Sequence, residues 1–256
     1  MKRKIGLILA ICVFLFSAYK LFTIWQEYHK GTAMYQKVEE EVITQVEPQE
    51  GEKEEGKEET NTGKCFRVDF EKLQATNEEV IAWIRFDKPQ KINYPIVQTT
   101  DNDTYLTKGF DGKENSAGTL FAEKLNAKDF SDKNTFIYGH NMKNGAMFGK
   151  LREYKSEKFC KKNPYFYIYT PDGTVRTYQV FSVEIVEHDS ECFQVYFRDD
   201  ASFEEYVNMI RENALYQTDV EVKKDDLLVS LSTCTNVKVT ERMVVHGVLL
   251  RVDQCE

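Results

Sequence analysis

Residues Asp226 to Gly247, DLLVSLSTCTNVKVTERMVVHG, hold two apolar runs separated by a polar segment. The first run starts at Leu227 and ends in the residues Ser-Thr-Cys, with Cys234 last, and the second opens directly after Arg242. Short apolar runs bounded by polar turn residues predict β-strands. The stretch therefore predicts two consecutive strands in which a cysteine at the end of one faces an arginine at the start of the next.

A second stretch upstream, NTFIYGHNM from Asn134 to Met142, repeats this design. Its β-branched and aromatic residues lead into Gly139 and His140, a pattern that predicts a strand ending at a turn. A cysteine, a histidine and an arginine are thus all placed at strand ends, where a rigid sheet positions side chains and a substrate can reach them.

The segment from residue 64 to the C-terminus contains mostly short strand signals separated by turns. Strands are predicted over 81–86, 94–98, 118–122, 134–139, 165–170, 174–186, 227–232 and 243–252, and helices or helical turns over 69–80, 101–106, 147–154 and 202–215. Eight short strands with a few inserted helices predict one mainly β domain built as a closed barrel.

The N-terminus has the pattern of a membrane helix. Three cations, Lys2 to Lys4, precede an apolar run from Ile5 to Trp25 that a single charged residue, Lys20, interrupts. Its 21 residues span about 30 Å as a helix, the thickness of a bilayer core. The cations predict a cytoplasmic N-terminus and an extracellular remainder. A cleaved signal peptide is the alternative, but no A-x-A-like site follows the run, so a single-pass cell-membrane anchor over residues 1–25 is preferred.

Residues 26–63 are expected to separate the anchor from the folded domain. The first part, 26–45, predicts a short helical stalk, whereas Glu47 to Gly63 has too few apolar residues to offset its ordering entropy and predicts a disordered spacer. Residues 39–59 hold ten Glu against two Lys, an excess equal to the net charge of −8 of the whole chain. The acidic balance therefore belongs to this linker. In the domain, 64–256, no basic stripe points to nucleic acid.

The cysteine pattern predicts a free thiol outside the membrane. Cys12 lies in the anchor, which leaves an odd five of the six cysteines outside, without a C-x-x-C pair. Cys234 is the candidate because it alone lies at a strand end near a cation. Its thiolate is a nucleophile, and His140 can take the thiol proton and later protonate a leaving amine. Arg242 can donate to an oxyanion, so the three residues predict an acyl-transfer site.

Other interpretations of these residues stay open. Cys234 can be a small buried hydrophobe in a membrane-tethered binding module without enzymatic activity. His246 competes with His140 because it is close to Cys234 in sequence, although the alternation of side chains gives it an ordinary strand position. A zinc site of Cys234, His140 and His246 lacks the spacing of structural zinc sites. His29 and His188 are expected to be solvated.

Two groups of residues resemble the signature of a known family. Leu231 to Thr235, LSTCT, with Arg242 and the V-V-x-G that follows, is similar to the active-site motif of sortases, the membrane-anchored cysteine transpeptidases of Gram-positive bacteria. Tyr138 to Met142, YGHNM, with G-x-M-F after it, is similar to the histidine region of class B sortases. The resemblance extends over roughly residues 70–252 and includes A-W-I at 82–84, Y-P-I-V-Q at 94–98 and G-T-L-F at 118–121.

This resemblance implies an eight-stranded sortase-type barrel with an N-terminal helix and with the helix at 202–215 inserted between strands 6 and 7. It implies that Cys234 attacks a carbonyl in the C-terminal sorting motif of an exported surface protein and forms a thioacyl enzyme, while His140 protonates the leaving amine. An amine of a peptidoglycan precursor or cross-bridge then resolves the intermediate. Arg242 either steadies the oxyanion or holds the substrate backbone.

The resemblance also assigns a substrate groove. The residues of this chain that match it are Asn102, Leu106, Tyr206, Ser232 and Thr233. Neither a cofactor nor a metal is implied. A cysteine peptidase that releases the acyl group to water uses the same residues and stays the alternative.

Overall fold

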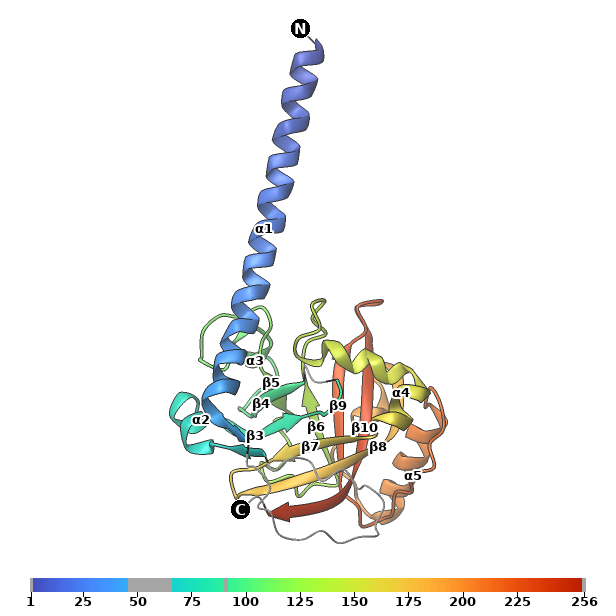
Figure 1. Cartoon of the computed structure of the whole chain (residues 1–256). Helices are drawn as coiled ribbons and strands as arrows, with labels where there is room; N and C mark the ends of the chain where they lie inside the picture. The colour runs from blue at the N-terminus through green and yellow to red at the C-terminus, as the bar shows by residue number, and fades with distance from the viewer. Residues whose placement is uncertain (1, 46–65, 90–91, 255–256) are drawn as a thin grey trace, which may run out of the picture.

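The computed structural model describes residues 2–45, 66–89 and 92–254. Within these ranges, eight strands form a closed barrel in the order β10-β8-β7-β3-β4-β5-β6-β9 (Figure 1). They are β3 (Val80–Arg85), β4 (Asn93–Val97), β5 (Leu120–Ala122), β6 (Asn134–Tyr138), β7 (Tyr165–Tyr169), β8 (Thr174–Glu187), β9 (Leu228–Cys234) and β10 (Glu241–Gln254). The predicted closed eight-stranded barrel is confirmed.

The pairing of the last strands decides which residues meet. β9 and β10 are antiparallel, whereas β6 and β9 are parallel, with Tyr138 opposite Ser232. Since parallel strands end at the same edge of a sheet, the residues that follow β6 lie beside the end of β9. The strand ends that the sequence marks with histidine and cysteine are therefore neighbours.

Aromatic side chains fill much of the core. The rings of Phe86, Phe166 and Tyr178 are stacked, with 5.2 Å between successive centroids. Gly247 makes room for this stack, because a Cβ there would lie 2.4 Å from Cε1 of Phe166. The pairing of β10 with β8 shifts register at this glycine, which is typical of a bulge that bends a barrel strand.

Helix α5 (Asp200–Glu212) lies between β8 and β9, the sixth and seventh strands of the barrel, as expected. It begins two residues earlier than predicted because Asp199 and Ser202 form a capping box. Its apolar face, which includes Phe203, Tyr206 and Ile210, is buried. The helix and the segment that leads into it therefore form one side of the molecule (Figure 1).

Two of the other helix predictions need correction. The helix expected over 69–80 is shorter: α2 (Phe70–Thr76) starts at the Asp69 cap and ends at Asn77, and β3 begins at Val80. The helix expected over 147–154 is a 3₁₀ helix, η1 (Phe148–Lys155). Further elements are α3 (Thr104–Thr107), α4 (Glu157–Lys162), η2 (Glu191–Phe193), and a small antiparallel sheet of β1 (Ile43–Gln45) and β2 (Phe66–Val68).

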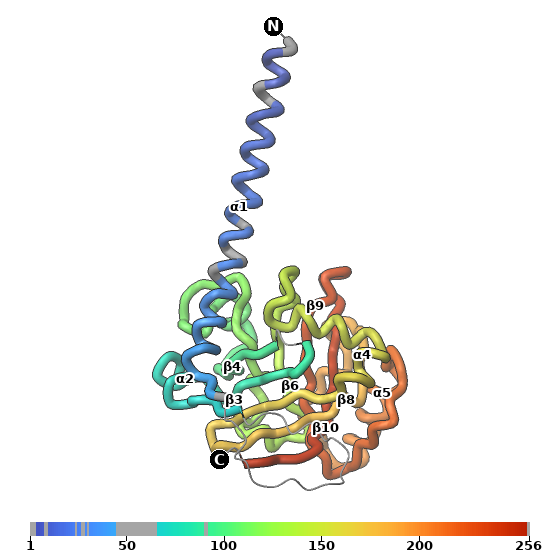
Figure 2. Tube along the Cα trace, viewed as in Figure 1, coloured from blue at the N-terminus to red at the C-terminus, as the bar shows by residue number. Residues whose placement is uncertain are grey.

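Helix α1 (Lys2–Val42) joins the apolar N-terminal run to the predicted stalk in one continuous element (Figure 2). Its segment Lys4–Thr23 is long and apolar enough to cross a membrane and is not buried against the rest of the chain. By length and composition this segment is either an anchor or a signal sequence. The predicted acidic spacer, Glu47 to Gly63, lies outside the described residues.

The last turns of α1 pack against the folded domain and do not form a free stalk. Tyr35 is only 2 % exposed, and its hydroxyl donates to the carbonyl of Gly118 and lies 2.9 Å from Oγ1 of Thr119. Val42 is buried as well. The folded unit therefore takes in these turns, which lie upstream of the start predicted at residue 64.

Candidate active site

Strand register brings the three predicted catalytic residues to one end of the barrel. Cys234, the last residue of β9, pairs with Arg242 of β10, so their side chains lie on the same face. His140 follows β6 by two residues, and the Tyr138–Ser232 pairing carried two residues further places it beside Cys234. All three side chains line one cleft.

The ring of His140 is held by the backbone of α3. Its Nε2 lies 2.6 Å from the carbonyl oxygen of Leu106. Since a carbonyl oxygen can only accept, Nε2 carries the hydrogen, and Nδ1 of the neutral ring is left as the base. The histidine is therefore fixed in a tautomer that can take a proton from a thiol.

Side-chain hydrogen bonds join the segment with His140 to the strand with Cys234. Asn141 Nδ2 donates to the carbonyl of Cys234 over 2.7 Å, and Thr233 Oγ1 donates to the carbonyl of Gly139 over 2.7 Å. Asn236 Nδ2 donates in turn to the carbonyl of Asn141 over 2.8 Å. Asn141 is thus a positioning residue that the sequence argument missed, although it directly follows His140 in the quoted motif.

Arg242 is held by its own turn. Its Nη1 donates to the carbonyls of Val239, over 2.8 Å, and Glu241, over 3.1 Å. Within the described ranges, the other nitrogens of the guanidinium have no hydrogen-bond partner in the protein. A planar cation with donors to spare at the mouth of the cleft suits a carbonyl oxygen that becomes negative.

The cleft has a volume of about 410 Å³ and contains most of the predicted substrate residues. Its lining includes Asn102, Leu106, Ser232 and Thr233. Asn102 is oriented by its amide, which donates to Glu123 Oε2 over 2.7 Å and accepts from the backbone of Lys124 over 3.0 Å. The walls are chiefly apolar with a few fixed polar groups, as expected for a groove that binds an extended peptide.

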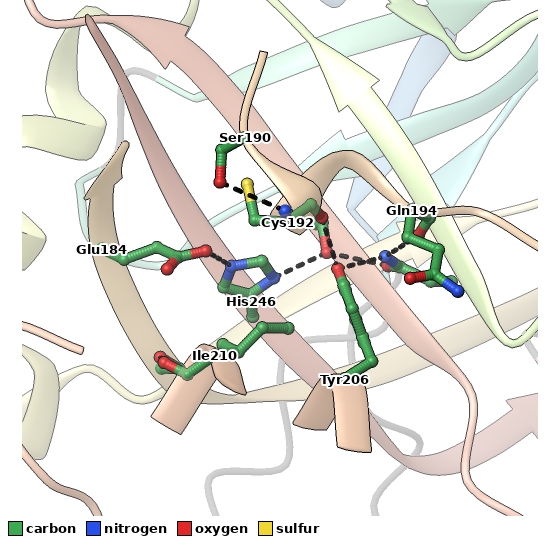
Figure 3. Close-up of polar contacts among 10 residues, drawn as sticks. Glu184, Ser190, Cys192, Gln194, Tyr206, Ile210 and His246 are labelled. Carbon is green, nitrogen blue, oxygen red and sulfur yellow. Dashed lines mark hydrogen bonds and ion pairs between the residues drawn. The ribbon is translucent and has the colours of Figure 1, made fainter. Parts of the chain in front are cut away.

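Tyr206 is the predicted substrate residue that the structure does not bring to the cleft. It is 3 % exposed, and its hydroxyl donates to the carbonyl of Cys192 over 2.6 Å and accepts from Asn134 Nδ2 over 2.7 Å (Figure 3). Its place on the buried face of α5, and not on the groove side, is the physical reason. The predicted substrate contact by Tyr206 is therefore not supported by its position.

His246 is also remote from the cleft. It is fully buried, with Nδ1 2.7 Å from Ser230 Oγ and Nε2 3.0 Å from Glu184 Oε1. It neither replaces His140 as the base nor joins Cys234 in a metal site. In the part of the chain that the structure describes, no group of three or more His, Cys, Asp and Glu side chains is arranged to hold a metal.

Five lining residues were not predicted as site residues: Phe121, Tyr138, Gly139, His188 and Phe193. His188 is exposed, as expected, but it lies at the rim of the cleft and not away from it. Tyr138 lies inside the histidine motif and donates to Glu123 Oε2 over 3.1 Å. Phe193 comes from η2, a segment without regular periodicity, so only the three-dimensional structure places it in the wall.

Burial separates Cys234 from the other described thiols. Cys160 and Cys192 are both buried, and loss of solvent raises the pKa of each thiol above its ordinary value. Cys234 is half-buried and opens into the cleft, whereas Cys12 is exposed on the apolar half of α1. Of the described cysteines in the folded domain, Cys234 is therefore the one that a substrate can reach.

Comparison with known proteins agrees with this geometry. A model of the sortase domain matches residues 87–250. Sortase B of Listeria monocytogenes is 34% identical over 193 residues, which cover 75% of this chain and 78% of the relative. Sortase B of Staphylococcus aureus is 26% identical over 188 residues, which cover 73% and 76% of the two chains.

Solved structures give the same result. The crystal structure of sortase B from B. anthracis in complex with AAEK1 superposes with a TM-score of 0.72 at 29% identity, over 89% of this chain and 99% of that one. The Staphylococcus aureus sortase B–substrate complex superposes with a TM-score of 0.67 at 25% identity, over 72% and 85%. The chain thus belongs to the sortase family, within its class B, and is a sortase-type cysteine transpeptidase.

Proposed function

We propose that this transpeptidase cleaves a C-terminal sorting motif of exported surface proteins at the cleft lined by Cys234, His140 and Arg242, and joins them to an amine of peptidoglycan. The observation that carries the proposal is the meeting of these three side chains in one peptide-sized groove. Membership of class B supports the reaction type, a cysteine transpeptidase in cell-wall anchoring.

In the first half-reaction the Cys234 thiol transfers its proton to Nδ1 of His140, and the sulfur attacks the scissile carbonyl carbon. Arg242 donates to the oxygen of the tetrahedral intermediate. The carbon–nitrogen bond then breaks, and the imidazolium returns its proton to the departing amine. A thioester on Cys234 is left, and His140 is neutral again.

In the second half-reaction an amine of peptidoglycan attacks the thioester. His140 takes a proton from the attacking nitrogen, the carbon–sulfur bond breaks, and the thiolate of Cys234 regains a proton. The net exchange is one amide bond for another. Water in place of the amine gives hydrolysis, so the outcome depends on which nucleophile reaches the thioester first.

An anchor in the apolar half of α1 would hold this cleft near a membrane. The turn between β9 and β10, whose base carries Cys234 and Arg242, points to the same side of the domain as the apolar half of α1 (Figure 1). Gly31, where the helix is buried, comes eight positions after Thr23, the end of the apolar segment, which is about 12 Å of helix. We infer a single-pass protein whose cleft lies close to the extracellular face of the cell membrane.

The test is transfer of five-residue sorting peptides to a triglycine amine, followed by mass spectrometry. Cys234→Ala is expected to abolish both cleavage and transfer, and His140→Ala to lower kcat by at least 100-fold. Cys160→Ala is the matched control, since it removes a buried thiol outside the cleft and is expected to keep kcat within twofold. Transfer by Cys234→Ala would contradict the proposal, and hydrolysis without transfer by the wild type would favour a peptidase.

A further inference from the structure

A chain of buried polar side chains connects the barrel to the segment that holds Cys192 and Gln194 (Figure 3), the neighbours of Phe193 in the cleft wall. The chain consists of Glu184, His246, Ser230, Asn134 and Tyr206, each 3 % exposed or less. It joins four strands and α5, yet none of its members lines the cleft. Polar groups this deeply buried destabilise a fold unless they are hydrogen-bonded, so the direction of each bond along the chain follows from which atoms can donate.

Two backbone carbonyls determine the direction of the chain. Tyr206 donates its only hydroxyl hydrogen to the carbonyl of Cys192 over 2.6 Å. Asn134 Nδ2 donates one hydrogen to the carbonyl of Gln194 over 3.0 Å and the other to the Tyr206 oxygen over 2.7 Å. Because carbonyls only accept, the amide of Asn134 has one possible orientation. The two carbonyls are those on either side of Phe193.

The same logic continues inward. Asn134 Oδ1 is left as an acceptor and takes the hydroxyl hydrogen of Ser230 over 2.8 Å. That hydrogen is then used, so His246 Nδ1, 2.7 Å away, must donate to Ser230. Nε2 of His246 faces Glu184 Oε1 at 3.0 Å, and one further proton lies between the two groups. The pair is an imidazolium with a carboxylate or an imidazole with a carboxylic acid, and Nδ1 carries a hydrogen in both.

This chain holds the cleft-wall segment together with local hydrogen bonds, from Phe193 N to the carbonyl of Ser190 over 3.3 Å and from Cys192 N to Ser190 Oγ over 3.2 Å. Phe193 ends the three-residue η2 and packs on Phe136, with 5.4 Å between ring centroids. Its backbone on both sides is held by Asn134 and Tyr206. Reversal of the Ser230–His246 bond would leave Asn134 Oδ1 without a donor, and turning the amide to regain one would set its oxygen against the carbonyl of Gln194.

We propose that His246, with Glu184 and Ser230, is a positioning unit that orients Asn134 and Tyr206 and so holds Phe193 as one wall of the peptide groove. The inference rests on the proposed function in one respect, that the peptide binds in this cleft. The unit acts on substrate binding and not on the reacting atoms. Its loss is expected to raise KM while kcat is kept.

The test compares two buried serines in the full-length protein in detergent micelles. Ser230→Ala breaks the chain, whereas Ser182→Ala removes an equally buried hydroxyl, which donates to the carbonyl of Ile210 on α5 over 3.1 Å but does not reach the wall. With the five-residue sorting peptide that the wild type transfers fastest, Ser230→Ala is expected to raise KM at least threefold with kcat within twofold. Ser182→Ala is expected to leave both unchanged.

An unchanged KM in Ser230→Ala, or an equal rise in Ser182→Ala, would overturn the inference. The proposed function fails separately, if Cys234→Ala still transfers peptide. A second readout needs no substrate. In the ¹⁵N NMR spectrum of histidine-labelled protein, His246, assigned with His246→Gln among the four histidines, is expected to carry a hydrogen on Nδ1. An unprotonated Nδ1 would show that Ser230 donates to His246. The hydrogen bond between them would then have the opposite direction to the one proposed, and the inference would fail.

Discussion

Gly139→Ala tests the geometry of the turn that presents His140. A Cβ at Gly139 would lie 2.3 Å from Cδ2 of Leu120 and 2.8 Å from Cδ2 of Phe148. Ordinary contact begins at 3.4 Å, so the turn and Leu120 must separate by 3.4 − 2.3, or 1.1 Å. Leu120 and Phe148 are both fully buried, in a core where neighbouring side chains resist displacement. The neighbouring turn, which includes His140, must take up part of the shift.

This overpacking is expected to lower the free energy of unfolding by about 1–3 kcal/mol. At roughly 2–4 °C for each kcal/mol, the melting temperature falls by about 2–12 °C. The effect on catalysis is larger, because a misplacement of about 1 Å at a catalytic group costs on the order of 100-fold in rate. We therefore expect kcat/KM for peptide transfer to fall by about 100-fold in a protein that is still folded at 25 °C.

Transfer kinetics and thermal unfolding of the same samples measure the two effects. Leu120→Val removes the clashing Cδ2 atom, so Gly139→Ala combined with Leu120→Val is expected to recover at least tenfold of the lost activity. Leu120→Val alone is the control and should remain within threefold of wild type. Wild-type activity in Gly139→Ala would refute the argument that close packing at this glycine positions His140.

Three further predictions concern the oxyanion donor, the docked helix and a buried thiol. Arg242→Ala is expected to lower kcat by about 10²–10³-fold, and Arg242→Lys to recover only part of it because an ammonium lacks the planar fork, as steady-state transfer kinetics will show. Tyr35→Phe removes the bond to the Gly118 carbonyl and is expected to lower the free energy of unfolding by about 1–3 kcal/mol in chemical denaturation. Burial raises the pKa of the Cys192 thiol above its ordinary value. Above about pH 8.5 the unfolded chain therefore loses a proton that the folded chain keeps, stability falls as the pH rises, and Cys192→Ala should flatten that fall in melts between pH 8 and 10.

The barrel and the reactive strand ends could be predicted because their signals are local. The apolar run of β9 and the turn after Tyr138 are each contained in a few consecutive residues, and sheet register then brings their ends together. Helix ends were less exact, because the Asp199 cap of α5 and the Asn77 end of α2 compete with neighbouring helix signals. Propensity alone does not decide that competition.

The misses depend on contacts between residues far apart in the sequence. The helical pattern of 26–45 does not show that Tyr35 binds Gly118, 83 residues away. The pattern of 202–215 puts Tyr206 on an apolar face, and only the position of the Cys192 carbonyl shows what its hydroxyl binds. In the same way, alternation correctly makes His246 an ordinary strand residue but cannot reveal Glu184 beside it.

The most direct test of the central claim is the intact mass of the full-length protein during a single turnover. The protein is mixed with excess sorting peptide without an amine, and the mass is followed before and after triglycine is added. The account predicts a covalent acyl adduct that maps to Cys234, is absent from Cys234→Ala and leaves as a ligated peptide when the amine arrives. An adduct on another residue, or peptide transfer by Cys234→Ala, would contradict it.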